Sequence, residues 1–362
     1  MKITFPTFGF GTAGGEKALV RIADRLVDKG HDVTFVVPFV CGYQKIYSTK
    51  AKLVRTPPII TGYKQLSVPY IVFLTSCVAL VPKIPKSDIV CASFCMTALP
   101  TVIATKLLGK GIPFYFVQHY ESLFFDKPLD GGFRSYARHT YKHFDNIITI
   151  SKWLDDKIYE HTGRRTTIIH PGIDLDAFSP RQKIGQSTTV VLCLGVNSVW
   201  KGNSDVIRAM EIVYEKFGNV KLVIVGRTQI KVNSDIPHEQ RKANDQELAE
   251  LYSSCDVFVL GSWYEGFPAP PLEAMACGAP VVTTDNLGIR EYGIDGENCL
   301  IVPPRNPEAM ANAILRLLSD EELCKKLSEN GPKTASQFSW DKTTDKIEHL
   351  FKDVLSRNQE RQ

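Results

Sequence analysis

The sequence lacks the signatures of a disulfide-stabilised or zinc-binding protein. Its 9 cysteines are an odd number, none forms a Cys-x-x-Cys pair, and only Cys91 and Cys95 lie close together. Structural zinc sites need more closely grouped ligands, so we interpret the cysteines as reduced thiols, most of them filling a core. The chain also opens without a charged and then apolar leader. We therefore expect a cytoplasmic protein.

No apolar run is long enough to cross a bilayer. The most apolar stretch, residues 70–81, lies between Pro69 and Pro82. As a helix it would rise about 18 Å, whereas the hydrocarbon core of a bilayer is roughly 30 Å thick. A buried helix is the favoured interpretation, and a short foot in the membrane interface is the alternative.

The composition is that of a globular protein with two domains of ordinary size. The 362 residues are 44% apolar and include 25 glycines and 21 prolines, which excludes a disordered or fibrous chain. The net charge of +4 is unevenly spread. Residues 1–180 contain 22 Lys and Arg against 14 Asp and Glu, and the remainder contains 21 against 25. This asymmetry indicates that the two halves meet different partners.

Strand-like and helix-like segments alternate along the whole chain. In the first half, strands are predicted at residues 2–5, 32–37, 88–92, 114–118, 146–150 and 166–170, with helices at 16–29, 96–108 and 152–161. The pattern restarts after the turn-rich segment 171–180, with strands at 188–194, 221–225, 257–260 and 280–283 and helices at 202–217, 272–277 and 307–318. This alternation predicts an α/β fold of two doubly wound, Rossmann-like domains, residues 1–183 and 184–340. Because ligands of such sheets bind beyond the carboxyl ends of the strands, we expect the site in a cleft across which the domains face each other.

A glycine-rich turn, Gly9-Phe-Gly11-Thr-Ala-Gly14, lies between the first predicted strand and helix. It matches the Gly-x-Gly-x-x-Gly pattern of dinucleotide-binding folds. An NAD-dependent dehydrogenase would carry a carboxylate at the end of its second strand, but residues 35–39 read Phe-Val-Val-Pro-Phe. A dehydrogenase is therefore only a third hypothesis. Gly14 and Gly15 still allow the backbone to approach an anionic or hydroxyl-rich ligand at the start of a helix.

The strongest motif is Glu265-Gly-Phe-Pro-Ala-Pro-Pro-Leu-Glu273-Ala-Met-Ala-Cys-Gly. It resembles the signature of the family-four retaining glycosyltransferases (glycosyl transferases group 1) of the GT-B fold, in which seven residues separate two glutamates. The resemblance implies that Glu265 and nearby amides hold the donor sugar and that Glu273 holds the nucleotide ribose. Because proline has no amide hydrogen, the candidate backbone donors are Gly266, Phe267, Ala269 and Leu272.

The same resemblance implies donor contacts elsewhere in the chain. Lys201 stands where the family keeps a lysine beside the donor diphosphate, and a cation there neutralises the leaving group. His119 stands where relatives keep a histidine against the donor sugar, which implies a positioning role. Together with Glu265, these residues are the candidate catalytic set. Many relatives read Gly-Arg where this chain has Gly195-Val196, and Arg227 is the candidate replacement for that arginine.

Further segments resemble the family in the same order along the chain. They are residues 14–34, 150–154, 170–178 and 288–303, whereas residues 40–112 match only diffusely. The resemblance implies that the first domain binds the acceptor and the second binds the nucleotide-sugar. It also implies that a final helix at 341–358 returns to the first domain.

Two conspicuous patterns receive weaker interpretations. Asp174-Leu-Asp176 has the Asp-x-Asp spelling of a metal site, but two exposed carboxylates are too few ligands, so we expect no metal. Arg134, Arg138 and Lys142 recur every four residues as one basic helical stripe. A solvated face is the default interpretation. The alternative is contact with an anionic acceptor, a lipid-linked glycan or the inner face of a membrane, and no motif favours nucleic acid.

The sequence thus predicts a retaining, metal-independent hexosyltransferase that uses a nucleotide-sugar as substrate and needs no cofactor. A hydroxyl acceptor in cell-surface polysaccharide or glycolipid synthesis is expected from the family resemblance. The alternative is a catalytically impaired binding or regulatory protein of the same fold, which only Val196 supports. The nucleotide base, the sugar and the acceptor are not selected by the sequence, because such contacts depend on the shape of the site.

Overall fold

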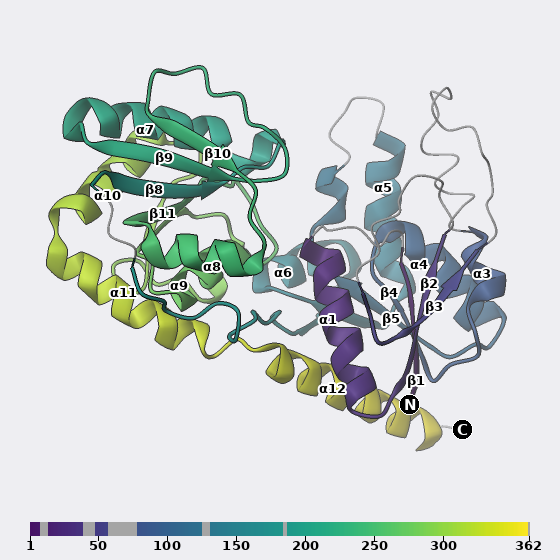
Figure 1. Cartoon of the computed structure of the whole chain (residues 1–362). Helices are drawn as coiled ribbons and strands as arrows, with labels where there is room; N and C mark the ends of the chain where they lie inside the picture. The colour runs from purple at the N-terminus through teal and green to yellow at the C-terminus, as the bar shows by residue number, and fades with distance from the viewer. Residues whose placement is uncertain (8–13, 39–47, 57–77, 125–130, 184–186, 361–362) are drawn as a thin grey trace. The chain divides into compact units, whose positions relative to one another are not determined.

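The computed structural model describes residues 1–7, 14–38, 48–56, 78–124, 131–183 and 187–360. The chain forms two compact units (Figure 1). Unit 1 contains residues Met1–Pro171 and Trp340–Gln362, and unit 2 contains Gly172–Ser339.

Unit 1 is built on a seven-stranded parallel sheet. Its strands are β1 (Lys2–Pro6), β2 (Asp32–Val37), β3 (Lys52–Arg55), β4 (Ile89–Ala92), β5 (Ile112–Val117), β6 (Asn146–Thr149) and β7 (Thr167–Ile168). Their order is β3-β2-β1-β4-β5-β6-β7. The strand order changes direction between β1 and β4. At such a switch point the segments after the two strands diverge and leave room for a ligand.

The helices of unit 1 alternate with the strands as predicted, but one of them ends in a π-helix. They are α1 (Gly14–Asp28), α3 (Leu80–Lys83), α4 (Cys95–Val102), α5 (Gly131–Thr140), α6 (Lys152–Thr162) and α12 (Trp340–Glu360). The helix predicted at 96–108 is instead α4 followed by a π-helix, η1 (Ile103–Leu107). Pro100 lies inside α4, and its missing amide hydrogen removes one helical hydrogen bond. Most of the helix predicted at 70–81 lies outside the described residues.

Unit 2 repeats the architecture with a six-stranded parallel sheet. Its strands are β8 (Thr189–Leu194), β9 (Val220–Val225), β10 (His238–Arg241), β11 (Val257–Leu260), β12 (Val281–Thr284) and β13 (Leu300–Val302), in the order β10-β9-β8-β11-β12-β13. Its helices are α7 (Asn203–Phe217), α8 (Asp245–Ser254), α9 (Ala269–Ala276), α10 (Pro307–Ser319) and α11 (Glu321–Ala335). Helix α7 packs against α10, and α9 packs against α8 and α11 (Figure 1). The switch point of this sheet lies between β8 and β11. The prediction of two doubly wound units is confirmed.

The chain passes from unit 1 to unit 2 earlier than the predicted position at 183. Residues 172–183 belong to unit 2 because they pair with its other segments. The Ile173 amide donates to the Phe338 carbonyl at 3.0 Å. The rings of Phe178 and Tyr252 lie 6.1 Å apart.

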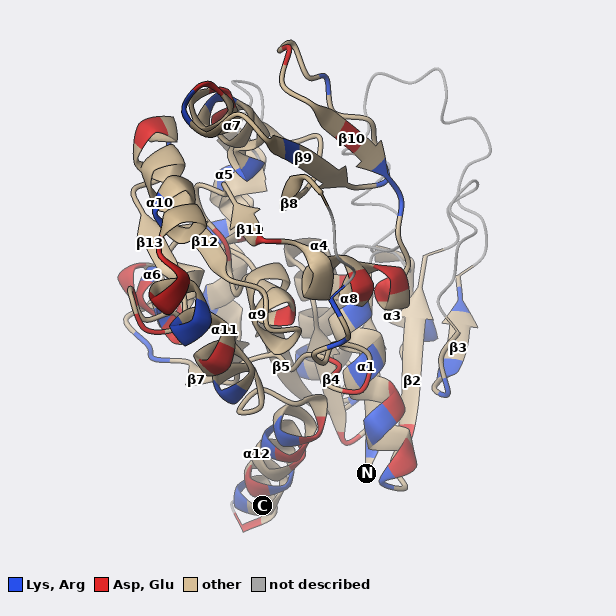
Figure 2. Ribbon diagram, turned by 60° about the vertical axis from the view of Figure 1, so that its left-hand side comes forward, with Lys and Arg blue, Asp and Glu red and all other residues tan. Residues whose placement is uncertain are grey.

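Helix α12 is fastened to unit 1 by ion pairs and by an aromatic contact. Arg25 on α1 bonds Asp341 at 2.8 Å, and Lys29 bonds Asp345 at 2.6 Å. The Phe351 ring packs edge-on against Phe114 of β5, with centroids 4.7 Å apart. Figure 2 shows that α1 and α12 both carry charges of both signs. Exposed ion pairs contribute little individually, so the buried aromatic contact is the stronger fastening.

We predict that Gly202 tolerates no side chain. Its φ is +64°, and an added Cβ would lie 2.0 Å from the Gly261 carbonyl oxygen. Gly296 in the same unit has a φ of +71° but has open space around it, so it is the matched control. Gly296→Ala should cost only the backbone strain of roughly 1–2 kcal/mol. Gly202→Ala should cost at least about 3 kcal/mol, because backbone atoms must also move apart.

The measurement is the urea midpoint of each variant, followed by tryptophan fluorescence. Equal losses in the two variants would contradict the close contact between the backbones at Gly202 and Gly261.

Candidate active site

The segments after β8 and β11 touch at the switch point of the unit 2 sheet. Gly202 precedes α7 and Gly261 follows β11, and neither position has room for a Cβ atom. Glycine at both positions lets the two backbones meet. The contact places the residues before Gly202 and after Gly261 side by side, although they are far apart in the sequence.

Lys201 and Glu265 form an ion pair at this point. The Lys201 ammonium lies 2.7 Å from Oε1 of Glu265, and the two side chains are 23% and 12% exposed. Both charged groups are therefore only partly accessible to water. The pair presents a positive and a negative group at one place.

Two aromatic rings hold the lysine. Its ammonium lies 4.2 Å from the centre of the Trp200 ring, a favourable cation–π distance. Trp200 in turn stacks on Tyr264, with ring centres 5.1 Å apart and an angle of 12° between the planes. Neither aromatic residue was among the predicted site residues, although each directly precedes one member of the ion pair. That adjacency is the signal by which they could have been found.

The loop that carries Glu265 is held by the backbone of the segment that follows β12. The Glu265 amide donates to the Asn286 carbonyl at 2.8 Å, and Glu265 forms a parallel bridge with Leu287. An added Cβ at Gly288 would lie 2.8 Å from the carbonyl oxygens of Glu265 and Gly266. Three backbone contacts with the segment 286–288 therefore set the position of Glu265.

The second glutamate of the motif lies on α9, in the same neighbourhood. Burial raises the pKa of the Tyr292 hydroxyl well above its usual value, and Cys299, Glu265 and Glu273 add to the effect. Both glutamates therefore act on one tyrosine. The structure brings Lys201, Glu265 and Glu273 into a single region of unit 2.

The four predicted backbone donors occupy the loop and the first turn of α9. Phe267 is buried, and its ring packs against Tyr292 at 5.1 Å and Phe338 at 5.6 Å. Leu272 is fully buried, whereas Ala269 begins the helix. The Phe267 side chain is thus part of the core, and only the backbone of this residue is a candidate for ligand contact.

Arg227 lies beside Val196, where the family resemblance implies an arginine. It is exposed after β9, and Val196 is exposed after the neighbouring strand β8. The two backbones touch one residue earlier, since an added Cβ at Gly226 would lie 2.2 Å from the Gly195 carbonyl oxygen. The geometry leaves Arg227 available to a ligand at this end of the sheet.

His119 follows β5 in unit 1, on a loop that contacts the start of α1. Its Nδ1–H donates to the Tyr120 carbonyl at 3.3 Å. The side-chain amide (Nε2) of the neighbouring Gln118 donates to the Gly15 carbonyl at 3.1 Å. Gly14 is the exposed first residue of α1, whereas Gly9 and Gly11 lie outside the described residues. Within unit 1 the structure therefore joins Gly15 to the histidine loop.

Asp174 and Asp176 belong to a tight turn of unit 2. The Ala177 amide donates to Oδ1 of Asp174 at 3.2 Å, which is the geometry of a side chain that stabilises a turn. In the described ranges, no group of three or more His, Cys, Asp or Glu has the arrangement of a metal site.

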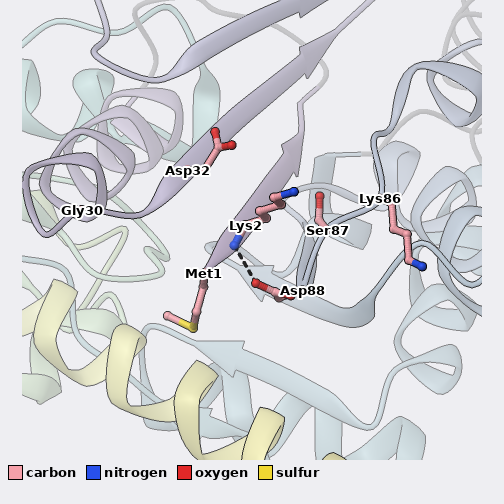
Figure 3. Close-up of a pocket in the computed structure, with 7 residues that line it drawn as sticks. All are labelled: Met1, Lys2, Gly30, Asp32, Lys86, Ser87 and Asp88. Carbon is pink, nitrogen blue, oxygen red and sulfur yellow. Dashed lines mark hydrogen bonds between the residues drawn. The ribbon is translucent and has the colours of Figure 1, made fainter.

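A hollow of about 530 Å³ lies at the amino ends of the unit 1 strands (Figure 3). Lys2 and Asp88 line it where β1 and β4 begin, and the Lys2 amide donates to Asp88 at 2.7 Å. Asp32 adds a second carboxylate at the start of β2. Because ligands of parallel sheets bind at the carboxyl ends, this hollow is separate from the candidate site.

No disulfide bond joins any of the seven described cysteines to one another, and all but Cys324 are buried. Burial raises the pKa of the Cys193 thiol to about 12, so it is an inert core residue.

Of the residues that the structure covers, none forms a helix that is both long and apolar enough to span a bilayer.

Two family models match adjoining parts of the chain. The model of glycosyltransferase family 4 matches residues 12–177, and that of glycosyl transferases group 1 matches residues 176–334. A curated relative, the uncharacterized glycosyltransferase MJ1178 of Methanocaldococcus jannaschii, is 24% identical over 98% of this chain and 99% of its own length. Several other curated relatives are matched over only 48% to 60% of their length.

Solved structures share the fold over nearly the whole chain. The sucrose-phosphate synthase of Thermosynechococcus elongatus superimposes with a TM-score of 0.81 at 18% identity, covering 98% of this chain and 99% of its own. HepE of Anabaena in complex with UDP and glucose gives a TM-score of 0.78 at 19% identity, covering 98% and 100%. The two matched models, the relatives and the shared fold lead to one conclusion: the chain belongs to the GT-B glycosyltransferases of family 4, also described as glycosyl transferases group 1.

Proposed function

We propose that this glycosyltransferase moves a hexose-type sugar from a nucleotide-sugar to a hydroxyl acceptor, with retention of anomeric configuration and without a metal ion. The ion pair between Lys201 and Glu265 at the switch point of the unit 2 sheet carries the proposal. A sugar diphosphate needs a cation for its phosphates and a carboxylate for its hydroxyls. This pair offers both within 2.7 Å.

The roles follow from the chemistry of each group. Lys201 binds the diphosphate, together with the amino end of α7, since the amide groups at a helix amino end favour an anion. Glu265 accepts hydrogen bonds from sugar hydroxyls, assisted by the amides of the loop that follows it. Glu273 on α9 binds the ribose. His119 in unit 1 contacts the donor sugar as a positioning group.

Arg227 supplies the second cation that Val196 cannot. Its guanidinium is exposed after β9, one strand from β8. An arginine can bind a phosphate with two parallel hydrogen bonds. Two cations and a helix end would neutralise the diphosphate leaving group, which is why we propose chemistry independent of a metal.

Glucose on a uridine nucleotide is the first donor to test, because the HepE complex was solved with UDP and glucose. We propose a polysaccharide or glycolipid as the class of acceptor, in keeping with the basic charge of unit 1. The alternative function, a binding or regulatory protein without turnover, rests on Val196 and predicts donor binding without hydrolysis.

We also propose that unit 1 contacts an anionic membrane surface. Lys106, near the end of η1, adds to the basic stripe of α5 and the segment after it. Burial lowers the pKa of His143, and His139 and Lys106 lower it further. Lys106 is therefore close to this stripe. Beside Lys106, Leu107 and Leu108 are 75% and 54% exposed. Cations next to exposed leucines fit a surface of anionic headgroups over an apolar interior. Such a contact would place the enzyme at the inner face of a membrane.

Replacing Lys201 by alanine is predicted to impair both donor binding and turnover. Loss of a group that stabilises leaving-group charge typically lowers turnover on the order of 10²- to 10³-fold. The measurements are slow hydrolysis of UDP-glucose and related donors, and the rise in melting temperature with a nucleoside diphosphate. Arg208→Ala, on the outer surface of α7, is the control. Unchanged hydrolysis and binding in Lys201→Ala would contradict the proposal, and binding by wild type without any turnover would favour the alternative.

Arg227→Ala is predicted to weaken donor affinity and turnover, but less than Lys201→Ala. Its side chain is more exposed, so solvent screens its charge more strongly. Lys231→Ala, a few residues further along the same connection, is the matched control. If the affinity of Arg227→Ala for UDP equals that of wild type, the replacement role of Arg227 is wrong.

Removing three cations from unit 1 is predicted to release the protein from anionic vesicles. In Lys106→Ala/Arg138→Ala/Lys142→Ala, the loss is about 1 kcal/mol per cation, roughly a hundredfold in total. The assay is sedimentation with vesicles containing phosphatidylglycerol, compared with neutral vesicles. Lys231→Ala/Lys325→Ala/Lys326→Ala removes as much charge from unit 2 and should bind like wild type. Equal binding by both triple variants would exclude this surface.

A further inference from the structure

Glu121 is a carboxylic acid in the interior of unit 1. It is 2% exposed and begins a short 3-10 helix, η2 (Glu121–Phe124), two residues after His119. Burial of a carboxyl group costs free energy unless hydrogen bonds compensate it. Its partners therefore indicate what the buried group does.

One oxygen of Glu121 accepts two hydrogen bonds. The Cys95 amide donates to Oε2 at 2.5 Å, and the Tyr115 hydroxyl donates to the same atom at 2.8 Å. Cys95 is the first residue of α4, and Tyr115 is a fully buried residue of β5. The carboxyl group thus fastens the start of η2 to a helix and to a strand of the sheet.

The η2 segment in turn supports the His119 ring. The Phe124 ring stacks on it, with centres 4.5 Å apart and an angle of 28° between the planes. Trp153 meets it edge-on at 6.4 Å. Because Phe124 is the last residue of η2, any rotation of η2 moves the surface on which the histidine rests.

We propose that Glu121 is a positioning residue that fixes η2 and, through Phe124, sets the orientation of the His119 ring. The inference rests on the proposed contact of His119 with the donor sugar. It adds a residue from the interior that shapes the site without touching the substrate.

The protonation state of Glu121 gives the inference a pH dependence. Burial raises the pKa of Glu121 to about 8, and the hydrogen bonds from Tyr115 and Cys95 oppose that rise. The ionisable groups of the described residues that act on it are Tyr115 of β5, Cys95 of α4 and Tyr141. The acid is therefore mostly neutral at pH 7. Above pH 8 a negative charge forms in an interior that solvates it poorly.

The sign of the stability effect follows from the raised pKa. Below the ordinary carboxyl pKa of 4.5, both folded and unfolded chains hold the proton. Between pH 4.5 and about 8, only the folded chain keeps the proton. The contribution of Glu121 to the free energy of unfolding therefore falls as pH rises, and it is lost by about pH 8. Glu121→Gln cannot titrate, so its melting temperature should lack this decline.

The test compares Glu121→Gln with Glu121→Leu by NMR of selectively labelled histidine. The His119 signal is identified by its loss in His119→Asn. Glutamine keeps an oxygen that can accept both hydrogen bonds, so we expect the His119 signal and turnover to stay close to wild type. Leucine accepts none, so the signal should shift and turnover should fall on the order of tenfold to a hundredfold.

Phe124→Ala is the matched control. It removes the stacking ring but leaves Glu121 intact, so it should shift the His119 signal and retain the pH-dependent decline in melting temperature. An unchanged His119 signal in folded Glu121→Leu would overturn the inference. If wild type shows no transferase activity, the proposed function fails, but the NMR comparison still decides whether Glu121 positions His119.

Discussion

The contact between the backbones at Gly202 and Gly261 is the constraint on which the candidate site of unit 2 depends. The carbonyl oxygen of Gly261 occupies the space that any side chain at Gly202 would need. The contact brings the segment after β8 against the segment after β11, at the point where the strand order changes direction. Lys201 directly precedes Gly202, and Glu265 follows Gly261 by a few positions. The contact between the two glycines therefore lets Lys201 and Glu265 meet at 2.7 Å.

The surrounding groups make that meeting point rigid. Trp200 and Tyr264 stack on each other, and the ammonium of Lys201 lies over the indole ring. On the far side of Glu265, the backbone of the segment after β12 holds the loop through Asn286. A site that must bind charge as it develops benefits from groups fixed before the reaction, because no reorganisation is then needed. The ion pair satisfies both charges while no ligand is bound, which limits the cost of keeping them half-buried.

The two units use different means to position their candidate residues. In unit 2 a half-buried ion pair rests on aromatic rings and on close backbone contacts. In unit 1 a buried, uncharged acid fixes a short helix, and the histidine rests on a ring from that helix. The second arrangement depends on pH, because burial raises the pKa of the Glu121 carboxyl group, which must hold its proton to remain in the interior.

Much of the fold could be predicted because its cause lies in neighbouring residues. Continuous apolar runs such as Val257–Leu260 form central parallel strands, and the predicted bounds of that strand are those of the structure. The short edge strands β3 and β10 were not predicted. His238–Arg241 is entirely polar, so its strand conformation comes from pairing with β9 and not from its own composition. The boundary near 183 was placed too late because the pairing of Ile173 with Ser339 joins residues distant in the sequence.

The sequence by itself determined the α/β class, the repetition of two doubly wound units and the motif that contains Glu265 and Glu273. Those features are local, since hydrophobic period, turn residues and motif spacing can be read within a short window. Only the tertiary structure decided that Lys201 pairs with Glu265, that Trp200 and Tyr264 stack, and that Glu121 is buried against Cys95 and Tyr115. These contacts join segments that are distant in the sequence. Sheet order and packing decide which residues meet, and no local pattern encodes them.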